Sequence, residues 1–329
     1  MAESSTLLEL PGMAAALLKT EDGLLRAVDA DEPLMTDLSR HLIKAGGKRI
    51  RPRLTIASAQ ALTDNPEIPG EDIISGGIAV ELVHQGSLYH DDVMDGAETR
   101  RNVESVNSRW GNREAILAGD YLLARASEIA AGLGTEVAGL LASTIASLCE
   151  GQLREIQSAF DPDRTENAYL ASISGKTAAL LATSARIGAI VAGHPREAVN
   201  ALGAFGHHYG MAFQVVDDLL DVMATDKELG KPAGNDLVEG VYTLPVIRTL
   251  AGPTGANLLA LLGEPMDLDS RDRARDLVRA DLAIGSTVVT ALDFINQARE
   301  ALTPLPSTPA VYTLQATCDL LTNRMSSFR

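Results

Sequence analysis

Three aspartates with the spacing D-D-x-x-D lie within residues 84–101 and are the clearest candidates for chemistry, namely Asp91, Asp92 and Asp95. On a helix, Asp91 and Asp95 share one face with Cβ atoms roughly 5–6 Å apart. Carboxylates that close repel by about 3 kcal/mol at an effective dielectric constant near 20. Positions 91–99 contain no lysine or arginine to offset this repulsion. The pattern therefore favours a bound cation, and Mg²⁺ fits best because it prefers carboxylate and phosphate oxygens.

The same spacing occurs a second time, at Asp217, Asp218 and Asp221. Both copies are embedded in apolar residues such as Leu88 and Val216, which places the carboxylates at the edge of a core, where unpaired charge is costly. A single copy would more often be a solvated helix face or a cap. Two acidic helices that face each other would instead form the entrance of a site in which metal ions bind a polyanion.

Positive groups are informative in this chain because its net charge is −16. This charge argues against nucleic acid as a partner, and any phosphate ligand must be held by local cations. Four cations follow the glycine pair Gly46-Gly47 within six residues, namely Lys48, Arg49, Arg51 and Arg53. Glycines let a backbone approach a ligand closely, so the cluster indicates either an anion site or the exposed basic start of a helix.

The tripeptide Gly175-Lys176-Thr177 is not part of a P-loop, because Leu170 stands where the first glycine of that motif is required. We interpret it as a lysine and a hydroxyl that open a helix at a substrate site.

The elements that position these residues are all predicted to be helices, since no alternating strand pattern of consequence occurs. The expected helices cover residues 6–28, 33–45, 54–62, 72 to the first acidic motif, 111–132, 136–159 and 211–222, with more helices between proline and glycine breaks after residue 243. Residues 225–240 are predicted to form a mobile flap.

Composition adds three expectations. The most apolar stretch, 178–193, is interrupted by Arg186 and falls short of the ~18 residues that a membrane span needs. The first residues lack the basic region of a secretory signal. Two cysteines, Cys149 and Cys318, argue against a disulfide framework and fit a reducing compartment. We therefore expect a cytoplasmic protein without a transmembrane segment.

Seven ordered blocks between about Lys44 and Arg248 resemble those of the trans-isoprenyl diphosphate synthases, also called polyprenyl synthetases. The blocks are GGKRIRP (46–52), the first D-D-x-x-D followed by Arg100 and Arg101, GDYLLARA (119–126), CEGQLRE (149–155), GKTAAL (175–180), FQVVDDLLD (213–221) and LGKPAGNDLVEG (229–240). The resemblance implies an all-α fold, a large helical bundle around a central apolar cavity. It also implies one domain over residues 1–329, with N-terminal helices in 1–45, a catalytic core in 46–250 and C-terminal helices in 251–329.

The activity implied by the resemblance is Mg²⁺-dependent head-to-tail condensation of isopentenyl diphosphate with geranyl, farnesyl or geranylgeranyl diphosphate. Diphosphate leaves only if its growing charge is neutralised by metal ions and fixed cations. The remaining carbocation needs an apolar tunnel that excludes water. By the same resemblance we expect three Mg²⁺ ions with substrate bound, and a homodimer.

Matched motif by motif, the resemblance assigns roles to single residues. The metal ligands would be Asp91, Asp92, Asp95, Asp217 and Asp221, with Asp218 acting indirectly. The allylic diphosphate or its surroundings would be held by Arg100, Lys176, Thr177, Gln214 and Lys231. Isopentenyl diphosphate would be held by Lys48, Arg51, His84 and Arg101. For His84, a satisfied core histidine is the alternative.

Product length is expected to depend on the residues four and five positions before the first aspartate, where the family uses bulky aromatics for short products. Here they are the small residues Ser87 and Gly86. Small side chains one turn (~5.4 Å) below the metal leave room for growth, so we expect a long all-trans product of about C30–C50.

Three positions depart from the family pattern. Asn102 stands where glycine is usual, Glu104 where proline is frequent, and Val241 where a lysine often reaches the diphosphate.

Two other functions are possible alternatives to the synthase. A terpene cyclase or head-to-head synthase would not need GGKRIRP, and a regulatory subunit typically loses one aspartate motif, whereas this chain keeps both.

Overall fold

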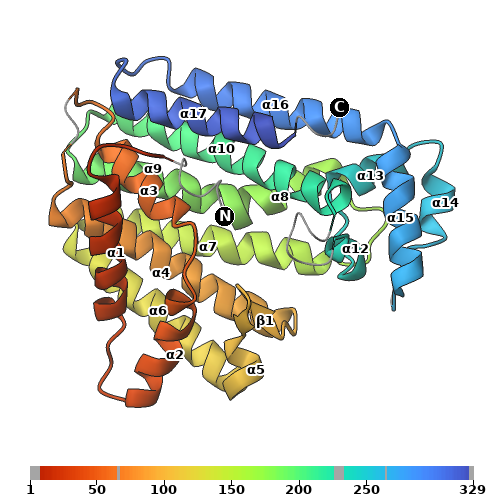
Figure 1. The fold of residues 1–329 in the computed structure, drawn as a ribbon, viewed down its shortest axis with the longest axis horizontal. Helices are drawn as coiled ribbons and strands as arrows, with labels where there is room; N and C mark the ends of the chain where they lie inside the picture. Colours follow the sequence, from red (N-terminus) through yellow and green to blue (C-terminus); the bar gives the residue numbers. More distant parts are fainter. Residues whose placement is uncertain (1–7, 65–66, 226–232, 264, 326–329) are drawn as a thin grey trace. The chain divides into compact units, whose positions relative to one another are not determined.

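The computed structural model describes residues 8–64, 67–225, 233–263 and 265–325. These residues form two compact units. Figure 1 shows the helices of both. Unit 1 comprises the segments 1–145, 180–206 and 301–317. Unit 2 comprises the segments 146–179, 207–300 and 318–329.

Unit 1 is helical apart from one small hairpin. Its elements are α1 (Met13–Ala27), α2 (Pro33–Lys44), α3 (Ile50–Ala59), α4 (Glu71–Met94), β1 (Thr99–Arg100), β2 (Val103–Glu104), α5 (Val106–Trp110), α6 (Asn112–Gly132), α7 (Thr135–Gln157) up to residue 145, α9 (Ala179–Val191) from residue 180, α10 (Arg196–Met223) up to residue 206 and α17 (Pro309–Arg324) up to residue 317.

Within the described residues of unit 2, all regular secondary structure is helical. Its elements are the remainder of α7, α10 and α17, together with α8 (Glu166–Ile173), the π-helical turn η1 (Ser174–Ala178), α12 (Asn235–Val238), α13 (Leu244–Leu250), α14 (Gly255–Leu259), α15 (Leu268–Ala280) and α16 (Ala283–Ala301).

Helix α4 is the buried centre of unit 1 and packs against α6, α3 and α1. Its apolar residues Ile78, Leu82 and Val83 are almost fully buried. The helix ends where Gly96 adopts a positive φ of 62°, and the Ala97 N–H donates to the Asp92 carbonyl at 2.9 Å. This is the hydrogen bond of a Schellman C-cap, and it fixes the first acidic motif at the carboxyl end of α4.

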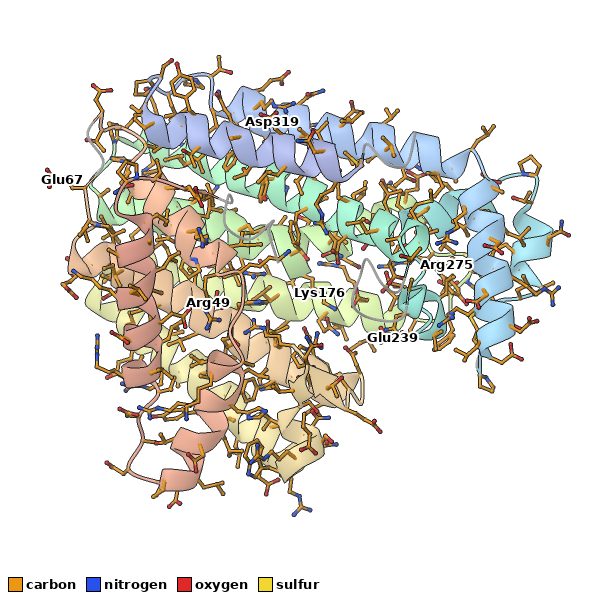
Figure 2. The ribbon with its side chains drawn as sticks, in the orientation of Figure 1. Arg49, Glu67, Lys176, Glu239, Arg275 and Asp319 are labelled. Atoms are coloured by element: carbon orange, nitrogen blue, oxygen red, sulfur yellow. The ribbon has the colours of Figure 1, made fainter. Side chains whose placement is uncertain are left out.

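The carboxyl end of α10 is anchored inside unit 2 by α15. Arg275 (labelled in Figure 2) donates to the carbonyls of Val222, at 2.7 Å, and of Ala224. Arg279 donates to the Val222 carbonyl at 2.8 Å. The last carbonyls of a helix lack intrahelical partners, so these two arginines fix the end of α10 that carries the second acidic motif.

The all-α expectation is confirmed, with corrections to single elements. The first helix begins at Met13, and the described residues 8–12 before it are not helical; Gly12 has a positive φ of 81°. Residues 6 and 7 of the expected helix lie outside the described residues. The third helix covers Ile50–Ala59 and not 54–62. The hairpin β1–β2 was missed, because two-residue strands leave no periodic pattern. Of the expected flap at 225–240, residues 226–232 lie outside the described residues, and α12 occupies part of the rest.

Candidate functional site

The first acidic motif lies in the last turn of α4 and its cap. Asp91 is half-buried, Asp92 is buried, and Asp95 is the exposed C-cap residue. The Asp95 N–H still donates to the Asp91 carbonyl at 2.8 Å, so the helical spacing extends to Asp95. The carboxyl end of a helix carries partial negative charge, and the last turn of α4 contains no basic residue. Acidic side chains at this position are therefore costly without an added cation.

Asp92 is the member of the motif that the protein itself engages. Its Oδ1 accepts from Arg100 Nε at 2.7 Å and from Nη2 at 2.5 Å. Burial raises the pKa of Asp92, although the Arg100 charge opposes this. Its Oδ2 is buried and has no hydrogen-bond partner among the residues described. Arg100, expected at the allylic diphosphate, thus lies against the first motif.

The hairpin β1–β2 gives the two consecutive arginines different positions: Arg100 lies in β1, and Arg101 lies in the turn. Thr99 pairs with Glu104 and Arg100 with Val103. The two turn residues, Arg101 and Asn102, have positive φ values of 54° and 62°, as a two-residue turn of type I′ requires.

Asparagine tolerates this conformation better than most residues. The departure from glycine at position 102 therefore keeps the turn. Glu104 ends the hairpin, and its carbonyl lies 2.7 Å from the His41 ring nitrogen Nε2.

Among the residues assigned to isopentenyl diphosphate, Arg51 and Arg101 carry positive charge close to His84. Burial, and then the charges of Arg51, Arg101, Arg49 and Arg100, lower the pKa of His84 well below its usual value. The imidazole is therefore neutral at pH 7. Burial also lowers the pKa of Arg51 to about 10, and the charge of Arg101 adds to this effect. Lys48, which precedes Arg51 in the sequence, is exposed.

Arg51 and Arg101 differ in how they are satisfied. Arg51 Nε is buried and has no hydrogen-bond partner within the described part of the chain. Arg101 Nη1 donates to the carbonyls of Leu42, at 3.1 Å, and of Gly46. Arg51 therefore has an N–H that can donate to an anion, whereas Arg101 is already held in place by hydrogen bonds to the loop before α3.

Nothing in the sequence distinguished Arg49 from the other cations of the basic cluster. It is 5% exposed and donates to Glu21, at 2.5 and 2.9 Å, and to Glu81 at 2.9 Å. Arg49, one of the four clustered cations, is therefore part of an ion-pair network inside the protein.

In the second acidic motif, in α10, the middle aspartate is again buried and hydrogen-bonded to protein side chains. Asp217 is exposed, whereas Asp218 and Asp221 are 4% and 3% exposed. Asp218 Oδ2 accepts from the Tyr169 hydroxyl at 2.5 Å, and Oδ1 accepts from Gln214 Nε2 at 2.8 Å. Burial raises the pKa of Asp218, against the effect of these two hydrogen bonds. Asp221 Oδ2 accepts from the Asp236 N–H at 3.3 Å.

Lys176 and Thr177 lie in the π-helical turn η1, between α8 and α9. The expectation that they open a helix is therefore corrected: they lie inside a continuous helical run. Lys176 (labelled in Figure 2) forms an ion pair with Glu155, and Thr177 Oγ1 donates to Gln214 Oε1 at 2.8 Å. Since Gln214 also holds Asp218, the turn is hydrogen-bonded to the second motif. π-Turns inside helices occur frequently at functional sites.

Arg164 and Tyr169 belong to the same network, and the sequence did not indicate either. Arg164 is 5% exposed and donates to the Tyr242 carbonyl at 3.0 Å. Its Cζ lies 5.6 Å from the centre of the Tyr169 ring. Tyr242 follows Val241, so a buried guanidinium lies next to the backbone of the position where the usual lysine is missing. Lys231 lies outside the described residues.

The two positions expected to control product length differ in their surroundings. A Cβ on Gly86 would lie 3.0 Å from the Gly119 carbonyl oxygen and 3.2 Å from Leu123 Cγ. Gly86 therefore faces α6 in close contact. Ser87 is half-buried, and its hydroxyl donates to the His84 carbonyl at 2.9 Å.

The acidic side chains suit a hard divalent cation. Among the described residues, no three His, Cys, Asp or Glu side chains are arranged as a complete metal-binding group. Mg²⁺ rarely needs one, because one or two carboxylates plus substrate phosphates and waters usually hold it. The buried Asp92 Oδ2, which lacks a partner among the residues described, provides such a carboxylate oxygen.

Within the described helices, none combines the length and the apolar character that crossing a bilayer requires.

Comparison with known proteins shows which family shares these features. Residues 32–278 match the family model of the polyprenyl synthetases. A nonaprenyl diphosphate synthase from Mycobacterium tuberculosis is 40% identical over 298 residues, covering 90% of this chain and 88% of that protein.

Two crystal structures agree with this match. A decaprenyl diphosphate synthase from Rhodobacter capsulatus superimposes with a TM-score of 0.87 at 31% identity, covering 95% of this chain and 97% of that chain. A polyprenyl synthase from Caulobacter crescentus, complexed with calcium and isoprenyl diphosphate, gives a TM-score of 0.86 at 32% identity, covering 94% of both chains. This chain therefore belongs to the polyprenyl synthetase family and is a prenyltransferase.

Proposed function

We propose that this prenyltransferase joins isopentenyl diphosphate head-to-tail to an allylic diphosphate and releases a long all-trans polyprenyl diphosphate. The observation that carries the proposal is that both D-D-x-x-D motifs lie at the carboxyl ends of helices, α4 and α10. The helix dipole makes negative charge costly there. Divalent cations offset that cost and also attract a diphosphate.

On the allylic side, the outer aspartates of each motif, together with Asp92, bind Mg²⁺, with three ions when substrate is present. Bound Mg²⁺ neutralises charge on the departing diphosphate. Arg100, Lys176 and Lys231 add fixed positive charge. Asp218, which already accepts two hydrogen bonds, acts indirectly by holding Gln214 and, through it, Thr177.

On the isopentenyl side, Arg51, Arg101 and Lys48 bind the second diphosphate. The support is the buried Arg51 Nε, which has no partner in the described ranges, beside the fixed guanidinium of Arg101. His84 is neutral because of its lowered pKa, so it contributes as a hydrogen-bond donor and not as a cation.

The product is proposed to be about C30–C50, grown from a geranyl, farnesyl or geranylgeranyl primer inside an apolar tunnel. Relatives named for nonaprenyl and decaprenyl products support this length. The small side chain of Ser87 on α4 supports it as well.

We further propose that the chain acts in the cytoplasm, as one functional domain and as a homodimer. Exposed apolar side chains on α6 support dimer formation: Ile116 is 44% and Leu117 58% exposed. A regulatory subunit stays the alternative function. It is disfavoured because both acidic motifs are retained.

The test is an assay with Mg²⁺, labelled isopentenyl diphosphate and farnesyl diphosphate, followed by product chromatography. We expect long linear products from the protein alone. Asp91→Ala and Asp217→Ala should each lower kcat/KM by about 100-fold or more, since lost metal stabilisation is worth several kcal/mol and each 1.36 kcal/mol is tenfold. Asp37→Ala, at an exposed aspartate on α2, is the control and should retain activity. Cyclic products, or activity only with a second subunit, would contradict the proposal.

A further inference from the structure

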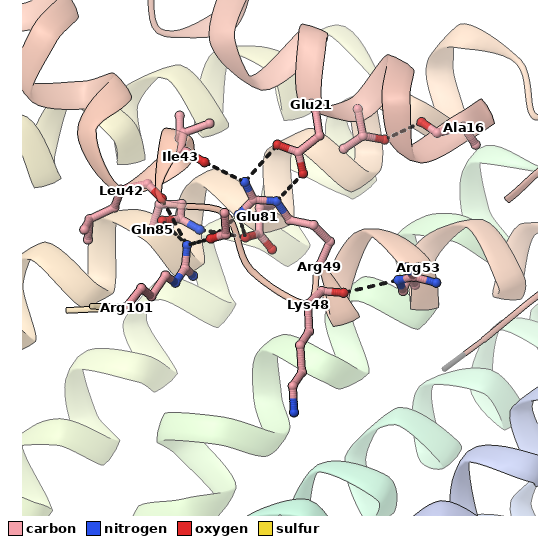
Figure 3. Close-up of polar contacts among 12 residues, drawn as sticks. Ala16, Glu21, Leu42, Ile43, Lys48, Arg49, Arg53, Glu81, Gln85 and Arg101 are labelled. Atoms are coloured by element: carbon pink, nitrogen blue, oxygen red, sulfur yellow. Dashed lines mark hydrogen bonds and ion pairs between the residues drawn. The ribbon is translucent and has the colours of Figure 1, made fainter. Parts of the chain in front are cut away.

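Glu81 is a buried carboxylate on α4, only 2% exposed. Its Oε1 accepts from Arg49 Nη1 at 2.9 Å and from Gln85 Nε2 at 2.7 Å (Figure 3). Gln85, one helical turn further along α4, is fully buried. Its Oε1 faces Arg101 Nη1 at 3.4 Å. A chain of polar side chains thus connects Arg49, Glu81, Gln85 and Arg101.

The charge of Glu81 acts on three arginines at once. It raises the pKa of Arg49, of Arg51 and of Arg101, in each case against the larger effect of burial. Arg51 and Arg101 repel each other, and this repulsion contributes to the lowered pKa of Arg51. Like charges crowded in a partly buried site need a counter-charge. Glu81 provides one from inside the unit.

The same network fixes the loop before α3. Arg49 donates to the Ile43 carbonyl at 2.9 Å, and Arg101 donates to the carbonyls of Leu42 and Gly46. Gly47 packs between the two guanidiniums: a Cβ there would lie 3.2 Å from Arg101 Cζ and 3.2 Å from Arg49 Nη1. The position of this loop, which carries Lys48, therefore depends on where both arginines are held.

We propose that Glu81 is a positioning residue for the isopentenyl diphosphate site: it holds Arg49 directly and Arg101 through Gln85, and so preorganises the cations that bind the diphosphate. The inference rests on the proposed assignment of Arg51 and Arg101 to that substrate. Glu81 itself touches no substrate in this proposal. A carboxylate would repel the diphosphate, so its contribution is to geometry.

This role predicts the sign of a measurable effect. If Glu81 only reduced the positive charge of the site, its removal would strengthen diphosphate binding. If it positions the arginines, its removal weakens binding, because preorganised groups lose less freedom when the ligand arrives. The two possibilities move the KM for isopentenyl diphosphate in opposite directions.

The test is Glu81→Gln, which keeps the shape and removes the charge. We expect the KM for isopentenyl diphosphate to rise about tenfold, while the KM for farnesyl diphosphate stays within about twofold. Calorimetric binding of isopentenyl diphosphate alone, without allylic substrate, should weaken by the same factor. Glu81→Asp should recover part of the affinity. Glu166→Gln, which removes a carboxylate on α8 that is paired with Arg248 of α13, is the matched control and should leave both KM values unchanged.

An unchanged or lower KM for isopentenyl diphosphate in Glu81→Gln would overturn the inference. If that variant does not fold, Gln85→Met removes the hydrogen bonds that connect Glu81 to Arg101 but leaves the Glu81–Arg49 ion pair, and it should raise the KM about threefold; no change would be equally decisive. Arg51→Met separates this inference from the proposed function. Loss of affinity in Arg51→Met but not in Glu81→Gln rejects the positioning role alone, whereas no effect of Arg51→Met rejects the substrate assignment.

Discussion

The middle aspartate of each acidic motif is buried and already engaged by protein groups. Asp92 accepts from Arg100, and Asp218 accepts from Tyr169 and Gln214. On a helix, adjacent residues point about 100° apart, whereas residues four apart share a face. The middle aspartates therefore face the protein, and Asp91 and Asp217 are more accessible. Asp221 is buried although it lies on the same helix face as Asp217, because residues outside α10 cover it. Identical residue types in one motif thus have different surroundings.

His84 permits a prediction about pH. Burial and four nearby arginines lower its pKa well below 6.5 in the folded protein, whereas in the unfolded chain it stays near 6.5. Below about pH 6.5 the unfolded chain therefore binds more protons, and the free energy of unfolding falls as the pH falls. We expect wild type to lose about 1 kcal/mol more stability than His84→Gln between pH 7.5 and pH 5.5.

Urea unfolding at both pH values measures this difference. Equal acid sensitivity of wild type and His84→Gln would show that His84 protonates as readily in the folded protein as in the unfolded chain.

At the level of elements, the contact between α4 and α6 decides which position can test product length. Gly86 approaches the Gly119 backbone so closely that a side chain there would force the helices apart. Overpacking of this kind typically costs about 1–3 kcal/mol. Ser87 already has a side chain, is only half-buried and lies one residue further along the helix.

We therefore expect Ser87→Phe to shorten the main product by several isoprene units without lowering the melting temperature greatly. Gly86→Phe should lower the melting temperature markedly, whatever it does to the product. Chromatography of the dephosphorylated products and thermal unfolding measure the two effects. An unchanged product distribution in a folded Ser87→Phe protein would reject the assignment of this position to the tunnel.

For the whole molecule, a net charge of −16 makes the location of the cations decisive. Arg49, Arg51, Arg100 and Arg101 gather near one helix, α4, in unit 1. Lys176 and Arg164 lie with the second motif in unit 2. Local clusters of cations of this kind allow an acidic protein to bind an anion, because short-range contacts outweigh the screened repulsion of distant surface charges.

The proposed homodimer gives a prediction at this scale. Leu117→Glu on the exposed face of α6 should convert the dimer to a monomer, because a charge in an apolar interface is costly when buried. Leu282→Glu is the control, at a side chain that is 92% exposed. Light scattering after size-exclusion chromatography measures the mass. A monomeric wild type, or a dimer that survives Leu117→Glu, would contradict the placement of the interface on α6.

The sequence by itself determined the helical class, the two acidic motifs, the basic cluster and the family resemblance, because these depend on local spacing and composition. It did not reveal that Arg49 pairs with Glu81, that Tyr169 and Gln214 hold Asp218, or that Gly86 faces α6. It also missed the β1–β2 turn and placed Lys176 and Thr177 at a helix start. Contacts such as Arg49 with Glu81 and Tyr169 with Asp218 join residues far apart in the chain, whereas the two-residue strands and the π-helical turn are too short to leave a periodic pattern. Only the tertiary structure brings those residues together, and burial then decides which charges are paired inside the protein.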